Sequence, residues 1–298
     1  MSARRVLTTL GLILALAATL TPPVLAAPAR PNEGRAQYYV SLGDSLSVGI
    51  QPDATGANQP SDVGYADQVY GALLPAMPRL QLVKLGCSGE TTQTMIEGGI
   101  CAYEKGSQLD EAVAFLRTHR PFVKLVAIDI GADDLLPCAG ETTVDLACVQ
   151  SAFDQVPGRL FQILRALRQA AGPDVPIVAI NYYNPLVAAW LQGGAGQELA
   201  LQSASLLGEF NAMLRAIYGL FSVPVGDVAA AFDSADFSTI VVVPGLGPVP
   251  QNVALVCGLT WMCVFPPQGP NVHPTADGYG VISEVILGVL PQSDGKRR

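Results

Sequence analysis

Residues 38–49 read YYVSLGDSLSVG and join a short apolar run to a tight turn. The first five of these residues favour a strand, and Gly43-Asp44-Ser45 follow without a gap. A buried strand that ends in such a bend is typical of an α/β sheet, in which ligands bind at the carboxyl ends of the strands. Ser45 is therefore a candidate nucleophile. The alternative is that Gly-Asp-Ser is only a turn.

Segments that favour strands and segments that favour helices alternate along the rest of the chain. We expect further strands at 80–85, 123–130, 175–182 and 223–228, and helices at 65–74, 108–119, 149–171, 198–218 and 281–290. This alternation predicts a parallel sheet covered by helices on both faces. Residues 239–267 contain five prolines and several glycines, so we expect a long apolar excursion without regular structure.

The first residues have the pattern of an export signal. Arg4 and Arg5 precede an apolar run that ends near Leu20, and small residues lead up to Ala26. We predict a signal peptide at 1–26, a flexible leader at 27–36, a single domain at 37–291 and a polar tail at 292–298. A transmembrane anchor is the alternative, but the run is short for a bilayer and two prolines follow it.

The chain is acidic, with a formal net charge of -8. Removal of the signal peptide would take away two arginines and no acid, which leaves -10. Binding to nucleic acid or to anionic lipid needs clustered Lys and Arg, so neither partner is expected. We expect a monomer with no stable membrane anchor and a small-molecule or lipid ester as its partner.

The six cysteines are interpreted as disulfides, because exported proteins keep their cysteines oxidised. Closeness in the sequence favours the pairs Cys87 with Cys101, Cys138 with Cys148 and Cys257 with Cys263, although other pairings are open. A metal site is the alternative. It is disfavoured because no pair has a two-residue gap and the chain has only 2 histidines.

Three of the predicted strands end in glycine turns, and a histidine precedes the last helix. The turns contain Ser45, Gly89 in GCSGETT and Asp133 in GADD, and the histidine is His273. This ordered set, from Gly43 to Tyr279, resembles the SGNH/GDSL hydrolases, a family of esterases and lipases. The resemblance implies a flavodoxin-like three-layer α/β/α sandwich with a central parallel sheet.

The resemblance also implies a role for each of these residues. Ser45 would be the nucleophile and His273 the base that takes its proton, because a serine hydroxyl is a poor nucleophile unaided. The backbone N–H groups of Ser45 and Gly89 and the side chain at 133 would form the oxyanion hole. No cofactor or metal ion is implied.

Two positions depart from the family pattern. Asp133 stands where the family has asparagine, and an ionised carboxylate can only accept hydrogen bonds. Either activity is low, or Asp133 stays protonated in a dry pocket and donates as an amide would. Pro270 stands where the family has the aspartate that orients the histidine. We expect the carbonyl of Pro270 to accept from Nδ1–H of His273 instead.

The resulting hypothesis is a secreted carboxylic ester hydrolase that works through an acyl-serine intermediate. Lipid or fatty-acyl esters are the preferred substrates, because the apolar segment 239–265 could supply a groove, with Trp261 and Phe265 as lining or core residues. A carbohydrate acetyl esterase is one alternative. A catalytically weakened binding protein on the same scaffold is another, suggested by Asp133 and Pro270.

Overall fold

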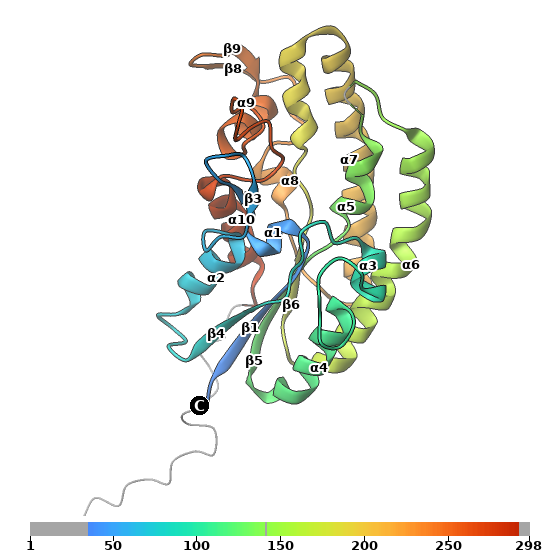
Figure 1. The fold of residues 1–298 in the computed structure, drawn as a ribbon, viewed down its shortest axis with the longest axis vertical. Coiled ribbons are helices and arrows are strands. Elements are labelled where there is room, and N and C mark those ends of the chain that lie inside the picture. Colours follow the sequence, from blue (N-terminus) through green and yellow to red (C-terminus); the bar gives the residue numbers. More distant parts are fainter. Residues whose placement is uncertain (1–34, 141, 292–298) are drawn as a thin grey trace, which may run out of the picture. The chain divides into compact units, whose positions relative to one another are not determined.

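The computed structural model describes residues 35–140 and 142–291. The predicted signal peptide, most of the leader and the tail lie outside the described residues. A five-stranded parallel sheet of order β4-β1-β5-β6-β7 forms the centre (Figure 1). Its strands are β1 (Gln37–Gly43), β4 (Leu80–Lys84), β5 (Val123–Asp129), β6 (Ile177–Ile180) and β7 (Val225–Gly226).

Helices cover both faces of this sheet, as the alternating pattern predicts. Helices α2 and α10 lie on one face, and α4, α6 and α7 lie on the other (Figure 1). The α-helices are α1 (Ser45–Val48), α2 (Tyr65–Leu73), α3 (Thr92–Glu97), α4 (Gln108–His119), α5 (Ala132–Leu135), α6 (Leu146–Ala171), α7 (Gly194–Leu220), α8 (Val228–Ala231), α9 (Gln251–Leu259) and α10 (Ala276–Val289). The predicted three-layer α/β/α fold is confirmed.

Short elements complete the architecture. They are the 3-10 helices η1 (Arg120–Phe122), η2 (Leu136–Cys138) and η3 (Pro185–Gln192), and two hairpins formed by β2 (Gln51–Pro52) with β3 (Asn58–Gln59) and by β8 (Ile240–Val243) with β9 (Gly247–Pro250). Both hairpins are antiparallel.

The register of the central strands brings the three glycine turns to one edge of the sheet. β1 pairs in parallel with both β4 and β5, and Gly43 lies opposite Asp129. Both strands are buried almost throughout, because helices cover the two faces of a parallel sheet. The turns that follow β1, β4 and β5 therefore meet where these strands end.

Two predictions about local structure need correction. Helix α6 begins at Leu146, before the predicted start at 149, because Asp145 caps it by accepting from the N–H groups of Ala147 and Cys148. The segment 239–267 is not irregular, since it contains β8, β9 and α9. Its prolines fit this structure: two lie on the short strand β9, and Pro250 also precedes the first turn of α9.

All six cysteines form disulfides in the predicted sequential pairs, Cys87–Cys101, Cys138–Cys148 and Cys257–Cys263. Each bond closes a short surface segment, and two of these segments flank turns at the carboxyl edge of the sheet. Of the helices in the described residues, none combines the length and the apolar character that a membrane span requires.

Candidate active site

Ser45 is the first residue of α1, directly after β1. The carboxylate of Asp44 caps this short helix by accepting from the N–H of Leu46 at 2.9 Å. Gly43 permits the bend, because its φ is +132° and a Cβ there would lie 1.8 Å from the carbonyl oxygen of Asp129. Within residues 35–140 and 142–291, the N–H of Ser45 has no acceptor. It is free to donate to a ligand.

The turns that carry Gly89 and Asp133 are tied to each other by Asp134. The carboxylate of Asp134 accepts from the N–H of Thr92 at 2.7 Å and from its hydroxyl at 2.8 Å. Gly89 has a φ of +84° and open space where a side chain would be. Its N–H also makes no hydrogen bond in the described part of the chain. Asp134 thus sets the position of Gly89 relative to Asp133.

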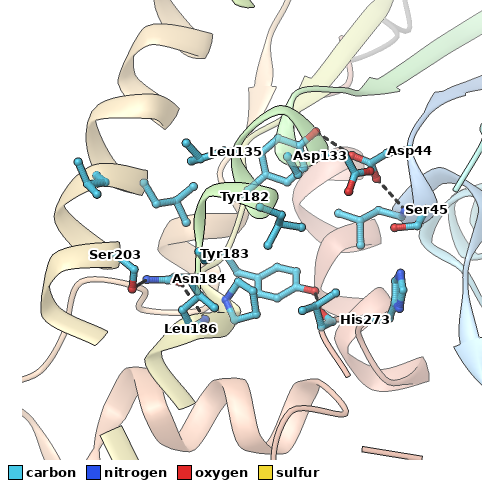
Figure 2. Close-up of a pocket in the computed structure, with 18 of the residues that line it drawn as sticks. Asp44, Ser45, Asp133, Leu135, Tyr182, Tyr183, Asn184, Leu186, Ser203 and His273 are labelled. Atoms are coloured by element: carbon cyan, nitrogen blue, oxygen red, sulfur yellow. Dashed lines mark hydrogen bonds between the residues drawn. The ribbon is translucent and has the colours of Figure 1, made fainter. Parts of the chain in front are cut away.

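His273 lies on the buried loop that leads to α10, and Figure 2 shows its imidazole beside Ser45. Nδ1 of His273 is 2.7 Å from Oδ1 of Asn271. The amide nitrogen of Asn271 donates to Oδ1 of Asn58 at 2.7 Å, which turns the amide oxygen toward the imidazole. The proton is therefore assigned to Nδ1, and Nε2 keeps the lone pair that a base needs. Burial lowers the pKa of His273 to about 4, so the ring is neutral at pH 7.

The predicted partner of His273 is wrong. In the described structure the carbonyl of Pro270 makes no hydrogen bond with His273, and the side chain of Asn271 takes that place. Asn271 also accepts from the N–H of His273 at 3.0 Å, which folds the loop back on itself. An amide two residues before the histidine was the signal in the sequence that could have suggested this partner.

Buried carboxyl groups surround the other side of the site. Asp44 and Asp129 are both almost fully buried, and Asp129 accepts from the N–H of Asp44 at 3.2 Å and from the hydroxyl of Tyr65. The hydroxyl of Tyr182 donates to Asp44 at 3.2 Å. Burial raises the pKa of Asp129 to about 7, and burial together with the nearby Asp129 raises the pKa of Asp44 well above its ordinary value.

Asp133 is a further carboxyl group of the site, and it lines the same pocket as Asp44. Burial is the main cause that raises its pKa to about 8, and the nearby charges of Asp44 and Asp134 add to it. Its side chain makes no hydrogen bond within residues 35–140 and 142–291. At pH 7 Asp133 therefore holds a proton that it can donate.

An apolar pocket opens beside Ser45 and His273. In Figure 2 these two residues lie at one end of the pocket and Asn184 and Ser203 at the other. The walls come mainly from aliphatic side chains of α5, η2, η3, α7, the start of α6 and the segment between η2 and α6, namely Leu135, Leu136, Val144, Val149, Pro185, Leu186, Leu206 and Leu207. Gly89 lies outside this lining, whereas Asp133 belongs to it.

The aromatic residues around the pocket differ from expectation. Trp261 and Phe265 lie outside the lining of this pocket; the Trp261 indole donates to Gln51 at 3.1 Å, and Phe265 is 88% exposed. Tyr182 and Tyr183 line the pocket instead. The hydroxyl of Tyr183 donates to the carbonyl of Val272, which fixes the loop that carries His273. Within the described residues no cluster of three His, Cys, Asp or Glu side chains is arranged to hold a metal ion.

Comparison with known proteins relates this arrangement to a family. A sequence model of the GDSL-like Lipase/Acylhydrolase family matches residues 41–281. No curated protein matches the chain in sequence. Among solved structures, an extracellular lipase from Streptomyces rimosus is 20% identical with a TM-score of 0.55, over 85% of this chain and 99% of that one.

Two further structures have similar scores. Phospholipase A1 from Streptomyces albidoflavus is 20% identical with a TM-score of 0.51, over 85% of this chain and 99% of that one. The acetylxylan esterase Axe2 from Geobacillus stearothermophilus is 15% identical with a TM-score of 0.52, over 85% and 93%. At these identities the similarity establishes a shared fold.

Proposed function

The chain belongs to the GDSL-like lipase/acylhydrolase family, and on this premise we propose that it is a serine carboxylic ester hydrolase that acts on fatty-acyl esters. The observation that carries this proposal is the meeting of Ser45, a neutral His273 and an apolar pocket at one edge of the sheet. No step of the proposed reaction calls for a cofactor.

Ser45 and His273 carry the covalent chemistry in this proposal. Oγ of Ser45 attacks the ester carbonyl while Nε2 of His273 takes its proton, and the imidazolium then passes that proton to the leaving alkoxide. Water hydrolyses the acyl-Ser45 ester by the same relay in reverse. Asn271 holds the ring by accepting from Nδ1–H, so it acts as a positioning residue.

The oxyanion hole consists of three donors. The unpaired N–H groups of Ser45 and Gly89 supply two of them. The third is the protonated carboxyl of Asp133, which burial keeps neutral below its pKa of about 8. Such a carboxylic acid donates one hydrogen bond, as an asparagine amide would at the same position. Ionisation of Asp133 would instead repel the oxyanion, so activity depends on this proton.

The lining of the pocket suits the alkyl chain of a fatty-acyl ester better than it suits a sugar. Aliphatic side chains from several helices form its walls, and its polar groups lie at its two ends (Figure 2). An alkyl chain gains free energy in such a lining, at about 25 cal/mol per Å² of buried apolar surface. A carbohydrate would leave its hydroxyl groups without partners there.

Labelling with a p-nitrophenyl phosphonate tests the nucleophile. We expect stoichiometric release of p-nitrophenol and a phosphonylated peptide that contains Ser45, and no labelling of Ser45→Ala. If a range of phosphonates leaves the protein unlabelled while it is folded, the hydrolase proposal fails, and a binding protein on this scaffold becomes the better account.

A chain-length series of p-nitrophenyl esters tests the substrate class. We expect kcat/KM to rise from acetate to the medium-chain esters, and Leu207→Trp, which fills the pocket, to lower it about tenfold or more for the longer esters only. Leu201→Trp is the matched control, because Leu201 lies on the exposed side of the same helix α7. A preference for acetyl esters, unchanged by Leu207→Trp, would favour the acetyl esterase.

Secretion is part of the proposal. It is supported by the three disulfides, which form in oxidising compartments, and by the predicted signal peptide at 1–26. The amino-terminal sequence of the exported protein tests it, and we expect the mature chain to begin near Ala27.

A further inference from the structure

The hairpin β8–β9 has an apolar outer face that the described part of the chain leaves uncovered. Val241 and Val243 of β8 pack against the core, whereas Ile240 is 57% exposed and Val242 is 79% exposed. A strand with one face in water ordinarily alternates apolar and polar residues. Here both faces of the strand are apolar, so a binding partner that removes the outer face from water would gain free energy.

The apolar surface continues around the turn of the hairpin. Pro244, Leu246 and Pro248 are exposed, with Leu246 at 38%. The sequence from residue 237 to residue 276, which includes the hairpin, contains no Asp, Glu, Lys or Arg. The hairpin of this acidic protein thus contributes no charged side chain to the surface.

This surface belongs to the same end of the domain as the pocket. Figure 1 shows the hairpin beyond the carboxyl ends of the strands. Helix α9, which follows the hairpin directly, packs against both of its strands and against η3. The ring centroids of Trp190 in η3 and Phe237, just before the hairpin, are 5.3 Å apart. Pro185 and Leu186 of η3 line the pocket. The hairpin is therefore braced against a wall of the pocket.

We propose that the β8–β9 hairpin docks the protein on a zwitterionic lipid surface, with Ile240, Val242 and Leu246 inserted among the acyl chains. A lipid surface removes such side chains from water without requiring matching charges. The net charge of -8 disfavours anionic membranes, whereas a zwitterionic surface adds no long-range repulsion. Docked in this way, the protein would take its acyl ester from the lipid phase close to the pocket.

A second copy of the chain fits the hairpin less well. Strand pairing between copies needs a free edge with N–H donors, and Pro248 and Pro250 remove two donors from β9. These prolines lie opposite Val242 and Ile240 in the register of the hairpin, so pairing along the β9 edge would lack their donors. The apolar side chains themselves project from the face of the ribbon, where a lipid surface can receive them.

Vesicle binding tests this inference. The inference rests on the proposed function. Binding is therefore measured with Ser45→Ala, which cannot form the acyl-enzyme, so that binding and hydrolysis are tested separately. The probes are vesicles of phosphatidylcholine alone and of phosphatidylglycerol alone, with co-sedimentation as the readout. The test variant adds Ile240→Ser, Val242→Ser and Leu246→Ser to Ser45→Ala. Circular dichroism and thermal unfolding establish that it is folded.

A matched control is available at the opposite end of the sheet. Leu220 is 71% exposed and ends α7, just before the chain enters β7 at its amino end. Leu220→Ser removes an exposed apolar side chain of the same kind far from the hairpin. We expect it to leave vesicle binding unchanged.

We expect Ser45→Ala to bind phosphatidylcholine vesicles more tightly than phosphatidylglycerol vesicles at low salt. The three hairpin substitutions should weaken binding to phosphatidylcholine at least about tenfold, which corresponds to roughly 1.4 kcal/mol. The inference is overturned if Ser45→Ala does not bind phosphatidylcholine, or if the folded hairpin variant binds as well as Ser45→Ala. It is also overturned if the hairpin holds a dimer together in sedimentation without binding vesicles.

Discussion

The sheet side of the candidate site, around Ser45, contains several carboxyl groups, among them Asp44, Asp129 and Asp133, whereas the described loop that carries His273 contains none. On the sheet side burial raises the pKa values of Asp44, Asp129 and Asp133. On the loop side the partner of His273 is the amide of Asn271, and burial lowers the pKa of the imidazole. Burial thus favours the neutral form on both sides, as a protonated carboxyl group on one and as an unprotonated imidazole on the other.

This difference shows how the site can work without a carboxylate beside its base. In the Ser-His-Asp arrangement the aspartate stabilises the imidazolium that forms during the reaction. In the proposed site Asp133 lies where the oxyanion would develop, and there it is useful only while protonated. The charge distribution therefore predicts an enzyme whose activity depends on a proton at Asp133 rather than on a charge beside His273.

Removal of the proposed nucleophile should have the largest effect on activity. Ser45→Ala leaves Asp133 and His273 in place but removes the group that forms the acyl-enzyme. We expect kcat for p-nitrophenyl butyrate to fall at least about a thousandfold, as for nucleophiles in other serine hydrolases. Steady-state kinetics of the folded variant check this. Retention of activity would mean that another residue is the nucleophile.

Changes at Asn271 test the loop side. Asn271→Ala should lower kcat about tenfold to a hundredfold, because Nδ1–H loses its acceptor and the ring its orientation. Asn58→Ala is the milder control, since it leaves the contact between Asn271 and His273 intact.

Asn271→Asp should raise the pKa of His273. A carboxylate beside Nδ1–H favours the imidazolium, so the pKa of His273 should rise from about 4 and the acid limb of kcat/KM should move to higher pH. A pH–rate profile measures this shift. An unmoved acid limb would show that Asn271 does not contact the ring of the base.

The free energy of unfolding should depend on pH in a way that reveals the proton held by Asp133. Its pKa is raised from 3.8 to about 8 in the folded protein, so the folded state holds a proton that the unfolded chain releases between these values. The free energy of unfolding should therefore fall with rising pH across that window, by up to about 1.4 kcal/mol per pH unit from this group. Asp133→Asn should lack this contribution. Urea unfolding of both proteins at several pH values measures it, and parallel curves would contradict it.

Local patterns in the sequence were sufficient for the bend that carries Ser45 and for the frame of the fold. The apolar run before Gly43-Asp44-Ser45 specifies β1 and its bend, and the alternation of strands and helices specifies the layers. The disulfide pairs could also be predicted from the sequence, because each bond joins two cysteines that lie close together in the chain.

The rest depends on contacts between residues far apart in the chain. Asn58 of β3 and Asn271 of the loop before α10 lie far apart in the chain, and no local pattern indicates that they pair. The apolar pocket has its walls in α7 and η3 and not in the apolar segment 239–265, because apolar side chains there pack on the core or form the outer face of the hairpin. The sequence showed that this segment is apolar, but it did not show whether its side chains face the pocket, the core or solvent.

The most direct test of the account is the pH dependence of kcat/KM for a soluble phenyl ester, measured for the wild type and Asp133→Asn and corrected for hydrolysis without enzyme. We predict that wild-type activity falls above pH about 8, where Asp133 ionises, and that Asp133→Asn keeps its activity through this range. An equal fall in both proteins, or a wild type that stays fully active well above that pH, would contradict a neutral carboxylic acid in the oxyanion hole.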